Sequence, residues 1–177
     1  VLELDNLTIS GSSKRESISN VNLSVKKHEI LGIAGISGNG QTVLANAISG
    51  LVKPSSGKIK IDGKTITSID PSKIIQTGVG RIPEDRHKDG IVGQMSVAEN
   101  MIIEDLNSGK IQSRGLLDRE AIMQNCSDLS SKYDVRGPGP NAPARLLSGG
   151  NIQKLILARV FEASPKLILA NQPTRGL

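Results

Sequence analysis

The sequence predicts an α/β fold, because apolar runs of strand character alternate with helical segments along the chain. One apolar run, residues 30–34, leads into a glycine-rich turn at 35–42 and then into a helix. A helix over residues 72–77, with Asp70 as its N-cap, is followed by an apolar strand at 79–82. This succession of strand, helix and strand favours a core of parallel strands.

The first part of the chain is predicted to form an antiparallel sheet. Apolar side chains alternate broadly over residues 2–9 and strictly over 21–25, which is typical of strands with one buried face. Residues 58–63 alternate as an edge strand that ends in a turn. The buried strand at 30–34 is expected to be set into this sheet.

A helical insert is predicted over residues 87–140. Ser96 and Glu99 have the spacing of a capping box, and Asp118 is the N-cap of a helix that ends near Tyr133. The apolar stripe of that helix consists of Ile122, Met123, Cys126, Leu129 and Tyr133. A glycine- and proline-rich linker closes the insert.

Composition narrows the class of protein. The 177 residues are enough for one sizeable domain, and the net charge of +5 is spread along the chain, which indicates solvated faces rather than a nucleic-acid site. One Tyr, one Phe and no Trp are poor material for base stacking. The single Cys126 fits a reducing cytoplasm and is expected to be a core thiol. His28 and His87 are expected on the surface, since neither has metal-ligand spacing.

The turn at 35–42 has the layout of a phosphate-binding P-loop. The residues expected to bind nucleotide there are Gly35, Ser37, Gly38, Asn39, Gly40, Gln41 and Thr42. The glycines let successive N–H groups point inward, and the helix N-terminus behind them adds partial positive charge. Gln41 stands where the motif has lysine, so a neutral amide replaces a full charge. The Thr42 hydroxyl can still reach Mg²⁺, although weakly.

A second anion-binding helix end is predicted at Ser148, Gly149 and Gly150. Ser148 can cap a helix that runs to about Ala163, and the paired glycines leave its first N–H groups open. Taken alone, such glycines also fit a plain linker, so their place in the order of motifs carries the prediction.

The predicted buried strand at 167–170 ends without acidic residues. In a P-loop ATPase this strand ends in carboxylates that order a magnesium-bound water and polarise the attacking water. Here Asn171 and Gln172 follow it. Both are neutral amides, and neither accepts a proton as a base near neutral pH.

The order of these motifs resembles that of an ATP-binding-cassette (ABC) ATPase domain over essentially the whole chain. Segment 147–151 is similar to the family's signature loop, and 172–177 to the segment after its Walker B strand. Segments 35–42, 83–90 and 147–151 further resemble the second, degenerate cassette of the double-cassette ATPases that serve simple-sugar and nucleoside importers. Gln41 and the 172–177 tail lean toward the nucleoside branch.

The resemblance implies a P-loop NTPase core with an antiparallel β subdomain and an α-helical subdomain. The core and β subdomain are expected at about 1–86 and 141–177, and the helical subdomain at about 87–140, in a domain that is truncated at its C-terminus. Glu84 stands where the family has a γ-phosphate-sensing glutamine and is expected to bind the nucleotide. The aromatic residue that usually stacks on adenine is missing.

In the family that the chain resembles, two cassettes pack head to tail, with ATP between one P-loop and the other signature loop. The chain's own site is therefore expected to bind ATP and Mg²⁺ weakly and to be deficient in hydrolysis. Across the interface, Ser148, Gly149, Gly150 and Asn151 would contact ATP held by the partner, with Ser148 acting catalytically in trans.

The resemblance also implies partners and a location. The expected partners are a second cassette, upstream in the same polypeptide, and membrane permease subunits, with no nucleic acid. The expected location is peripheral, on the cytoplasmic face of the plasma membrane. The charged loop at 84–90 is either a solvated turn or a contact with a membrane subunit, for which Arg86 and Lys88 are the candidates.

Two other functions stay open. One is a non-hydrolysing, nucleotide-gated dimerisation module. Measurements of nucleotide affinity and hydrolysis, with and without the partner cassette, would distinguish it from an importer ATPase subunit. The other is a soluble ABC ATPase of DNA repair or translation. The lack of paired cysteines, long heptad repeats and a basic aromatic surface argues against it.

Overall fold

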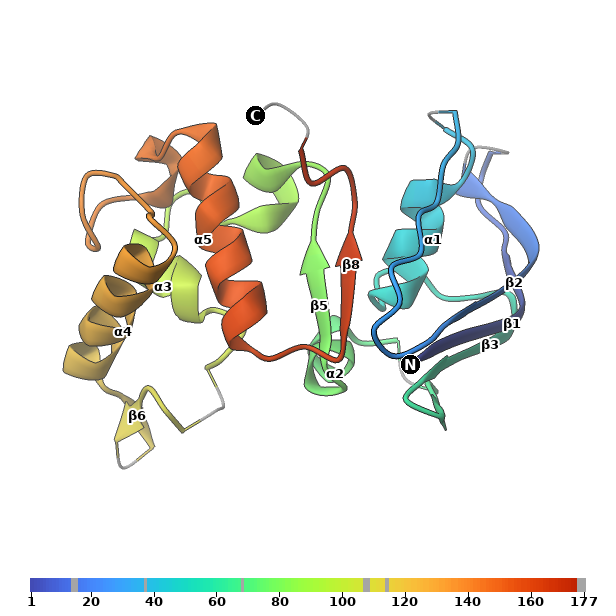
Figure 1. Cartoon of the computed structure of the whole chain (residues 1–177), viewed down its shortest axis with the longest axis horizontal. Helices are drawn as coiled ribbons and strands as arrows, with labels where there is room; N and C mark the ends of the chain where they lie inside the picture. Colours follow the sequence, from blue (N-terminus) through green and yellow to red (C-terminus); the bar gives the residue numbers. More distant parts are fainter. Residues whose placement is uncertain (14–15, 37, 68, 107–108, 114, 175–177) are drawn as a thin grey trace. The chain divides into compact units, whose positions relative to one another are not determined.

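The computed structural model divides by its internal contacts into unit 1, Val1–Val79, and unit 2, Gly80–Leu177 (Figure 1). It describes residues 1–13, 16–36, 38–67, 69–106, 109–113 and 115–174. Strands and helices alternate as the α/β prediction requires. Among the helices of the described residues, none is long and apolar enough to cross a membrane.

Unit 1 is built on a four-stranded antiparallel sheet with the strand order β2-β1-β3-β4. Its strands are β1 (Leu2–Ile9), β2 (Ile18–Val25), β3 (Ser56–Ile61) and β4 (Lys64–Thr65). In β1, Leu4 and Leu7 are both buried, although they break strict alternation. The pairing with β2 shifts register between them, and Asn6 has a φ of 46°. This bulge explains why the apolar pattern of β1 is only broadly alternating.

The strand predicted at 58–63 and the turn that ends it are confirmed, but its predicted position at the edge of the sheet is wrong. β3 pairs with β1 on one side and with β4 on the other. Asp62 and Gly63 have φ values of 53° and 77°. Two successive residues of positive φ form the tight turn that suits a β-hairpin, so the chain returns at once as β4.

The prediction of a buried strand at 30–34 within this sheet is also wrong. No strand is assigned over the described residues 29–36. The side chains of Ile30, Ile33 and Ile36 are 98%, 52% and 78% exposed. A strand needs a neighbouring backbone that completes its hydrogen bonds, and an apolar run alone does not supply one.

Two helices complete unit 1. The first, α1 (Gln41–Ile48), buries Leu44 and Ile48. The second, α2 (Pro71–Gln76), begins as predicted at Asp70, whose Oδ1 accepts a hydrogen bond from the Ser72 N–H at 3.0 Å.

Unit 2 contains β8 (Leu167–Ala170) and all but the first residue of its partner strand β5 (Val79–Ile82). Figure 1 shows both strands running in the same direction, so the predicted parallel arrangement is confirmed for this pair. The strand predicted at 167–170 is confirmed, but the prediction that it is buried is wrong, because Leu167 and Leu169 are half-buried whereas Ile168 and Ala170 are exposed.

The core of unit 2 surrounds α5 (Gly149–Glu162), which lies between the strand pair and α3 (Val97–Ile102) and α4 (Arg119–Lys132) (Figure 1). The core side chains of α5 that are completely buried include Ile152, Leu155 and Ile156. The predicted stripe of α4 packs into this core, and Cys126 is buried within it. Burial raises the pKa of the Cys126 thiol, as expected for an inert core cysteine.

The predicted caps of unit 2 are confirmed. Ser96 and Glu99 form a reciprocal capping box at α3, and Asp118 caps α4 through the N–H groups of Glu120 and Ala121. The smaller elements are a hairpin of β6 (Gln112–Ser113) and β7 (Leu116–Leu117) and a 3₁₀ turn, η3 (Ala144–Leu146).

The charged segment predicted as a loop at 84–90 contains a short π-helix, η2 (Arg86–Gly90). Its N-cap is Asp85, whose Oδ1 accepts hydrogen bonds from the N–H groups of His87 and Lys88, each at 3.0 Å. These hydrogen bonds lower the pKa of the Asp85 carboxyl, with the Lys88 N–H as the largest cause. The loop prediction missed the helix because periodicity over five residues is too short to detect.

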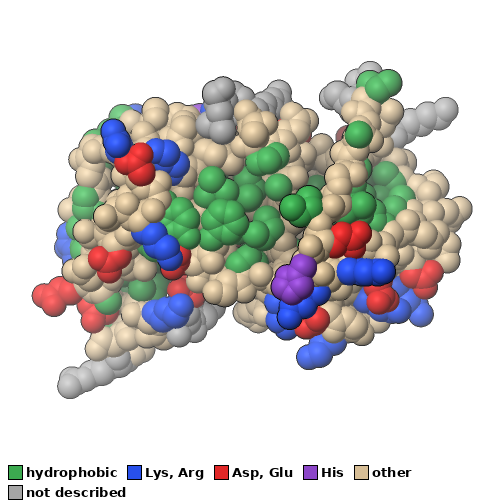
Figure 2. All heavy atoms as spheres, viewed as in Figure 1, with side chains coloured by type: hydrophobic (Ala, Val, Ile, Leu, Met, Phe, Trp, Pro, Cys, Tyr) green, Lys and Arg blue, Asp and Glu red, His purple; other side chains and the backbone are tan. Residues whose placement is uncertain are grey.

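The surface carries charges of both signs. Figure 2 shows that Lys and Arg side chains on the visible face are interspersed with Asp and Glu. His28 and His87 are both exposed, which confirms their prediction as surface histidines.

Candidate functional site

The P-loop residues lie in unit 1, where the chain passes from irregular backbone into α1. Gly38 and Gly40 have φ values of 88° and 92°, which side chains rarely adopt. Gly40 is the N-cap of α1 and offers no side-chain cap, so the first N–H groups of the helix stay available to an anion. A Cβ at Gly40 would also lie 2.5 Å from Ile18 Cγ2. Ser37 falls outside the described residues.

Gln41 turns its amide back onto the loop. Its Nε2 donates a hydrogen bond to the Ile36 carbonyl at 3.3 Å, and the same atom lies where a Cβ of Gly35 would be. A donor that a lysine would direct at phosphate therefore stabilises the loop backbone. Thr42 is exposed in the first turn of α1, where its hydroxyl is accessible.

The signature residues lie in unit 2, at the start of α5. Ser148 is the N-cap, as predicted. A Cβ at Gly150 would meet no atom within 4 Å, whereas one at Gly149 would lie 2.5 Å from Nη2 of Arg86. The first turn of α5 is thus open at Gly150 and flanked at Gly149 by a cation. Both features favour an anion at this helix end.

Sequence reasoning did not foresee that Arg86 reaches Gly149. It treated Arg86 and Lys88 as candidate contacts with a membrane subunit, a prediction that stays open. No periodic or motif signal relates η2 to α5, because their proximity arises from the fold. The packing of Gly90 on Ile156 shows the same contact, since a Cβ there would overlap the Ile156 Cδ1.

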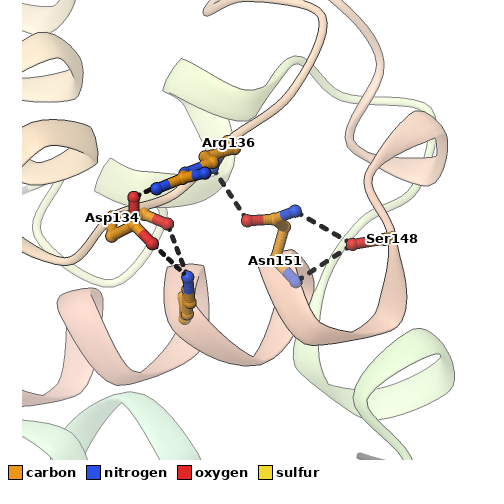
Figure 3. Close-up of polar contacts among 5 residues, drawn as sticks. Asp134, Arg136, Ser148 and Asn151 are labelled. Carbon is orange, nitrogen blue, oxygen red and sulfur yellow. Dashed lines mark hydrogen bonds and ion pairs between the residues drawn. The ribbon is translucent and has the colours of Figure 1, made fainter.

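A polar network surrounds Asn151 (Figure 3). Its Nδ2 donates to Ser148 Oγ at 2.9 Å, and its Oδ1 accepts from the Arg136 N–H at 2.8 Å. Asp134 accepts from Arg136 Nε and from Lys154 Nζ, at 2.7 Å in each case. The Lys154 hydrogen bond, followed by that of Arg136, lowers the pKa of the Asp134 carboxyl. The signature loop is therefore braced by a segment that precedes it in sequence.

Glu84, Asn171 and Gln172 follow the ends of the strand pair in unit 2. Because β5 and β8 run in the same direction, the residues after each strand lie at one edge of this small sheet. The Asn171 N–H donates to the Ile82 carbonyl at 3.0 Å, which ties the end of β8 to β5. Gln172 is exposed, with a φ of 47°.

The residues present fit a polyphosphate better than a magnesium ion. An uncapped helix end and positive-φ glycines supply N–H donors. Mg²⁺ prefers carboxylate oxygens, whereas Thr42, which follows these glycines, offers only a neutral hydroxyl. Within the part of the chain that the structure describes, no group of three or more His, Cys, Asp or Glu side chains could hold a metal ion.

Curated proteins of similar sequence include nucleoside importer components. The chain is 45% identical over 177 residues to the nucleoside import ATP-binding protein NupA of Lactococcus lactis subsp. cremoris, covering all of this chain and 35% of that protein. It is 41% identical over 177 residues to the guanosine import ATP-binding protein NupO of Bacillus subtilis, with the same coverage. The chain thus spans about a third of the length of these relatives.

A solved structure and a family match agree with these relatives. One such structure is the dimeric post-hydrolysis state of the ATP-binding cassette MJ0796, bound to ADP and Pi. The match covers all of this chain and 76% of the MJ0796 chain, with a TM-score of 0.78 and 26% sequence identity. The ABC transporter family profile matches residues 18–175. The chain therefore belongs to the ABC transporter family, as one of its ATP-binding cassettes.

Proposed function

We propose that the chain is the nucleotide-binding domain of an importer that couples ATP binding and hydrolysis to uptake of a nucleoside or a simple sugar. One observation carries this proposal: the match to a nucleoside import ATP-binding protein at 45% identity extends over the whole chain. The guanosine import relative favours the nucleoside branch. These import relatives also favour the proposal over a soluble ATPase of DNA repair or translation.

The domain's own P-loop site is proposed to hold nucleotide weakly and to hydrolyse it little. The backbone donors around Gly38 and Gly40 can bind phosphate oxygens. Gln41 adds no charge and donates to its own loop. Asn171 and Gln172 stand where the family has its two acids, and neither amide can take the proton of an attacking water.

The signature end of α5 is proposed to complete the partner cassette's site in trans. Its open N–H groups, the Ser148 hydroxyl and the nearby Arg86 cation would face the phosphates of ATP held by the partner. Hydrogen-bond donors at this position stabilise negative charge that develops as the terminal phosphate transfers to water.

The proposed assembly contains a second, complete cassette upstream in the same polypeptide, together with membrane permease subunits. The length of the relatives leaves room for such a cassette. The domain would then lie at the cytoplasmic face of the plasma membrane. Within it, we propose that the P-loop core and β subdomain comprise about 1–86 and 141–177, and the helical subdomain about 87–140.

The test compares the two sites in the full-length ATPase assembled with its membrane subunits. Ser148→Arg should abolish transport-coupled ATPase activity, because a bulky side chain replaces the hydroxyl at the partner's phosphates. Thr42→Ala should have a milder effect, because it affects only the degenerate site. Gln124→Ala, which removes an exposed amide bonded to Asp128 on α4, is the control. The reverse ranking of Ser148→Arg and Thr42→Ala would contradict the asymmetric arrangement.

A further inference from the structure

The oxygen of Ser148 is held as a hydrogen-bond acceptor by its own helix. Ser148 Oγ accepts from the Asn151 backbone N–H at 3.4 Å and from Asn151 Nδ2 at 2.9 Å (Figure 3). A hydroxyl oxygen has two acceptor lone pairs, so these donors occupy both. The hydroxyl hydrogen must then point away from Asn151. Since the side chain is exposed, this hydrogen is available to an external acceptor.

The orientation of the Asn151 amide is fixed by a partner that can only donate. The Arg136 backbone N–H lies 2.8 Å from one end of the amide. A backbone N–H has no acceptor capacity, so the atom that faces it is the carbonyl oxygen, and the amide nitrogen faces Ser148. Reversing the amide would set two donors against each other at Arg136.

The Arg136 N–H is in turn held against α5. Lys154 lies on α5 close to one turn beyond Asn151, and its Nζ donates both to the Asp134 carbonyl at 2.8 Å and to the Asp134 carboxylate at 2.7 Å. The Arg136 side chain closes the arrangement through its own bond to Asp134. The segment 134–136 is therefore attached to α5 at two places, which keeps the Arg136 N–H in register with Asn151.

We propose that Asn151 is a positioning residue: its amide keeps Ser148 Oγ in the acceptor role, so that the Ser148 hydroxyl donates its hydrogen to a terminal phosphate oxygen of the nucleotide held by the facing cassette. This inference rests on the proposed function in trans. It differs from the expectation that Asn151 contacts the nucleotide directly, because it assigns the amide a role within the domain, through its bonds to Ser148 and Arg136.

A double-mutant cycle separates these two roles. Wild type, Ser148→Ala, Asn151→Ala and the double variant are compared in the full-length ATPase assembled with its membrane subunits. Ser148→Ala should lower kcat about 100-fold, as expected for the loss of one transition-state donor. Asn151→Ala should lower kcat about tenfold, through a misdirected hydroxyl. In the Ser148→Ala background, Asn151→Ala should change kcat by less than about twofold, because no hydroxyl remains to be positioned.

Binding and folding controls distinguish a misdirected hydroxyl from weaker nucleotide affinity or an unfolded domain. Equilibrium binding of radiolabelled MgATP to Asn151→Ala should stay within about threefold of wild type, since the hydroxyl acts mainly on the transition state. Thermal unfolding should show that the variants are folded, with Gln124→Ala as the matched amide deletion. If Asn151→Ala fails to fold, Asn151→Asp replaces it. That variant keeps the acceptor for Arg136, and its second oxygen takes the Ser148 hydrogen.

The outcomes are distinct. Equal losses from the Asn151 substitution in both backgrounds would overturn the positioning role and indicate a direct contact with nucleotide. Wild-type kcat in Asn151→Ala, with a loss in Ser148→Ala, would overturn the inference while the proposed function stands. Wild-type activity in Ser148→Ala would overturn the proposed function itself. For Asn151→Asp, a loss that persists in the Ser148→Ala background would overturn the positioning role, because added charge alone would then account for it.

Discussion

At the scale of single residues, Asp134 binds two cationic side chains and so holds the backbone segment that contacts the signature loop. It accepts hydrogen bonds from both Arg136 and Lys154, although its side chain is about half exposed (55%). Water screens each ion pair, so the individual gains are small. The importance of Asp134 lies in geometry, because its two cations hold the segment whose backbone bonds to Asn151.

The lowered pKa of Asp134 makes a pH-dependent contribution to stability. Because the folded-state pKa lies below the unfolded value, this contribution is fully present above about pH 4 and is lost as the pH falls through the folded-state pKa. Asp134→Asn should therefore lower the urea midpoint at pH 7, and its difference from wild type should disappear toward about pH 2. Asp128→Asn, which removes a carboxylate bonded to the neutral Gln124 amide, is the control. A constant difference at every pH would contradict this account.

At the scale of elements, α5 is held to its neighbours by a buried cation. Arg159 donates to the Asn100 carbonyl at 3.1 Å and to the Gly90 carbonyl at 3.0 Å, and it pairs with Glu104 at 2.9 Å. Its side chain is only 7% exposed. One residue thus joins the C-terminal half of α5 to the ends of α3 and η2.

Removing this cation should loosen unit 2. Arg159→Ala leaves two buried carbonyls and a carboxylate without their partner, and should lower the free energy of unfolding by about 3–5 kcal/mol. Lys132→Ala, which removes an exposed cation paired with Glu162 at 2.6 Å, should have a much smaller effect. Guanidinium chloride unfolding of the full-length protein, followed by circular dichroism, makes the comparison. Equal losses of unfolding free energy in the two variants would contradict the role proposed for Arg159 in holding α5 to α3 and η2.

Helices were easier to predict from sequence than strands, for a local reason. Each N-cap side chain accepts a hydrogen bond from an N–H group no more than three residues ahead, so both partners lie in one short stretch of sequence. This holds for Asp70, Ser96, Asp118 and Ser148. The pairing of β3 depends on a turn at Asp62 and on a second strand beyond it. The segment at 30–34 has the apolar character of a strand, but no strand in the described part of unit 1 pairs with it.

At the scale of the whole molecule, the family was predictable from the order of the motifs, whereas the chemistry of the sites stays a prediction. The P-loop, the signature serine and the amides after β8 could be identified by residue type and spacing. The approach of Arg86 to Gly149 and the bond from Arg136 to Asn151 could not, because both join segments that are distant in sequence. Such contacts result from the packing of α5 against its neighbours.

Restoring only the P-loop lysine should separate binding from hydrolysis. In the full-length ATPase with the partner P-loop inactivated, Gln41→Lys should tighten MgATP binding at least about tenfold, because it adds a full charge where the amide supplies none. Hydrolysis at this site should stay undetectable, since the amides Asn171 and Gln172 still replace the family's two acids and cannot accept a proton. Equilibrium dialysis and single-turnover phosphate release measure the two quantities. Turnover in this variant would contradict the degenerate-site proposal.

The unpaired apolar segment at 29–36 has a consequence for production of fragments. The segment contains several branched aliphatic side chains and no proline. In the described part of unit 1, its backbone has no strand partner. Segments of this kind template intermolecular β-pairing when they stay uncovered. A fragment comprising residues 1–79 alone should therefore precipitate on expression. A lysine substituted at Ile33 should keep that fragment dispersed, as charged gatekeepers do.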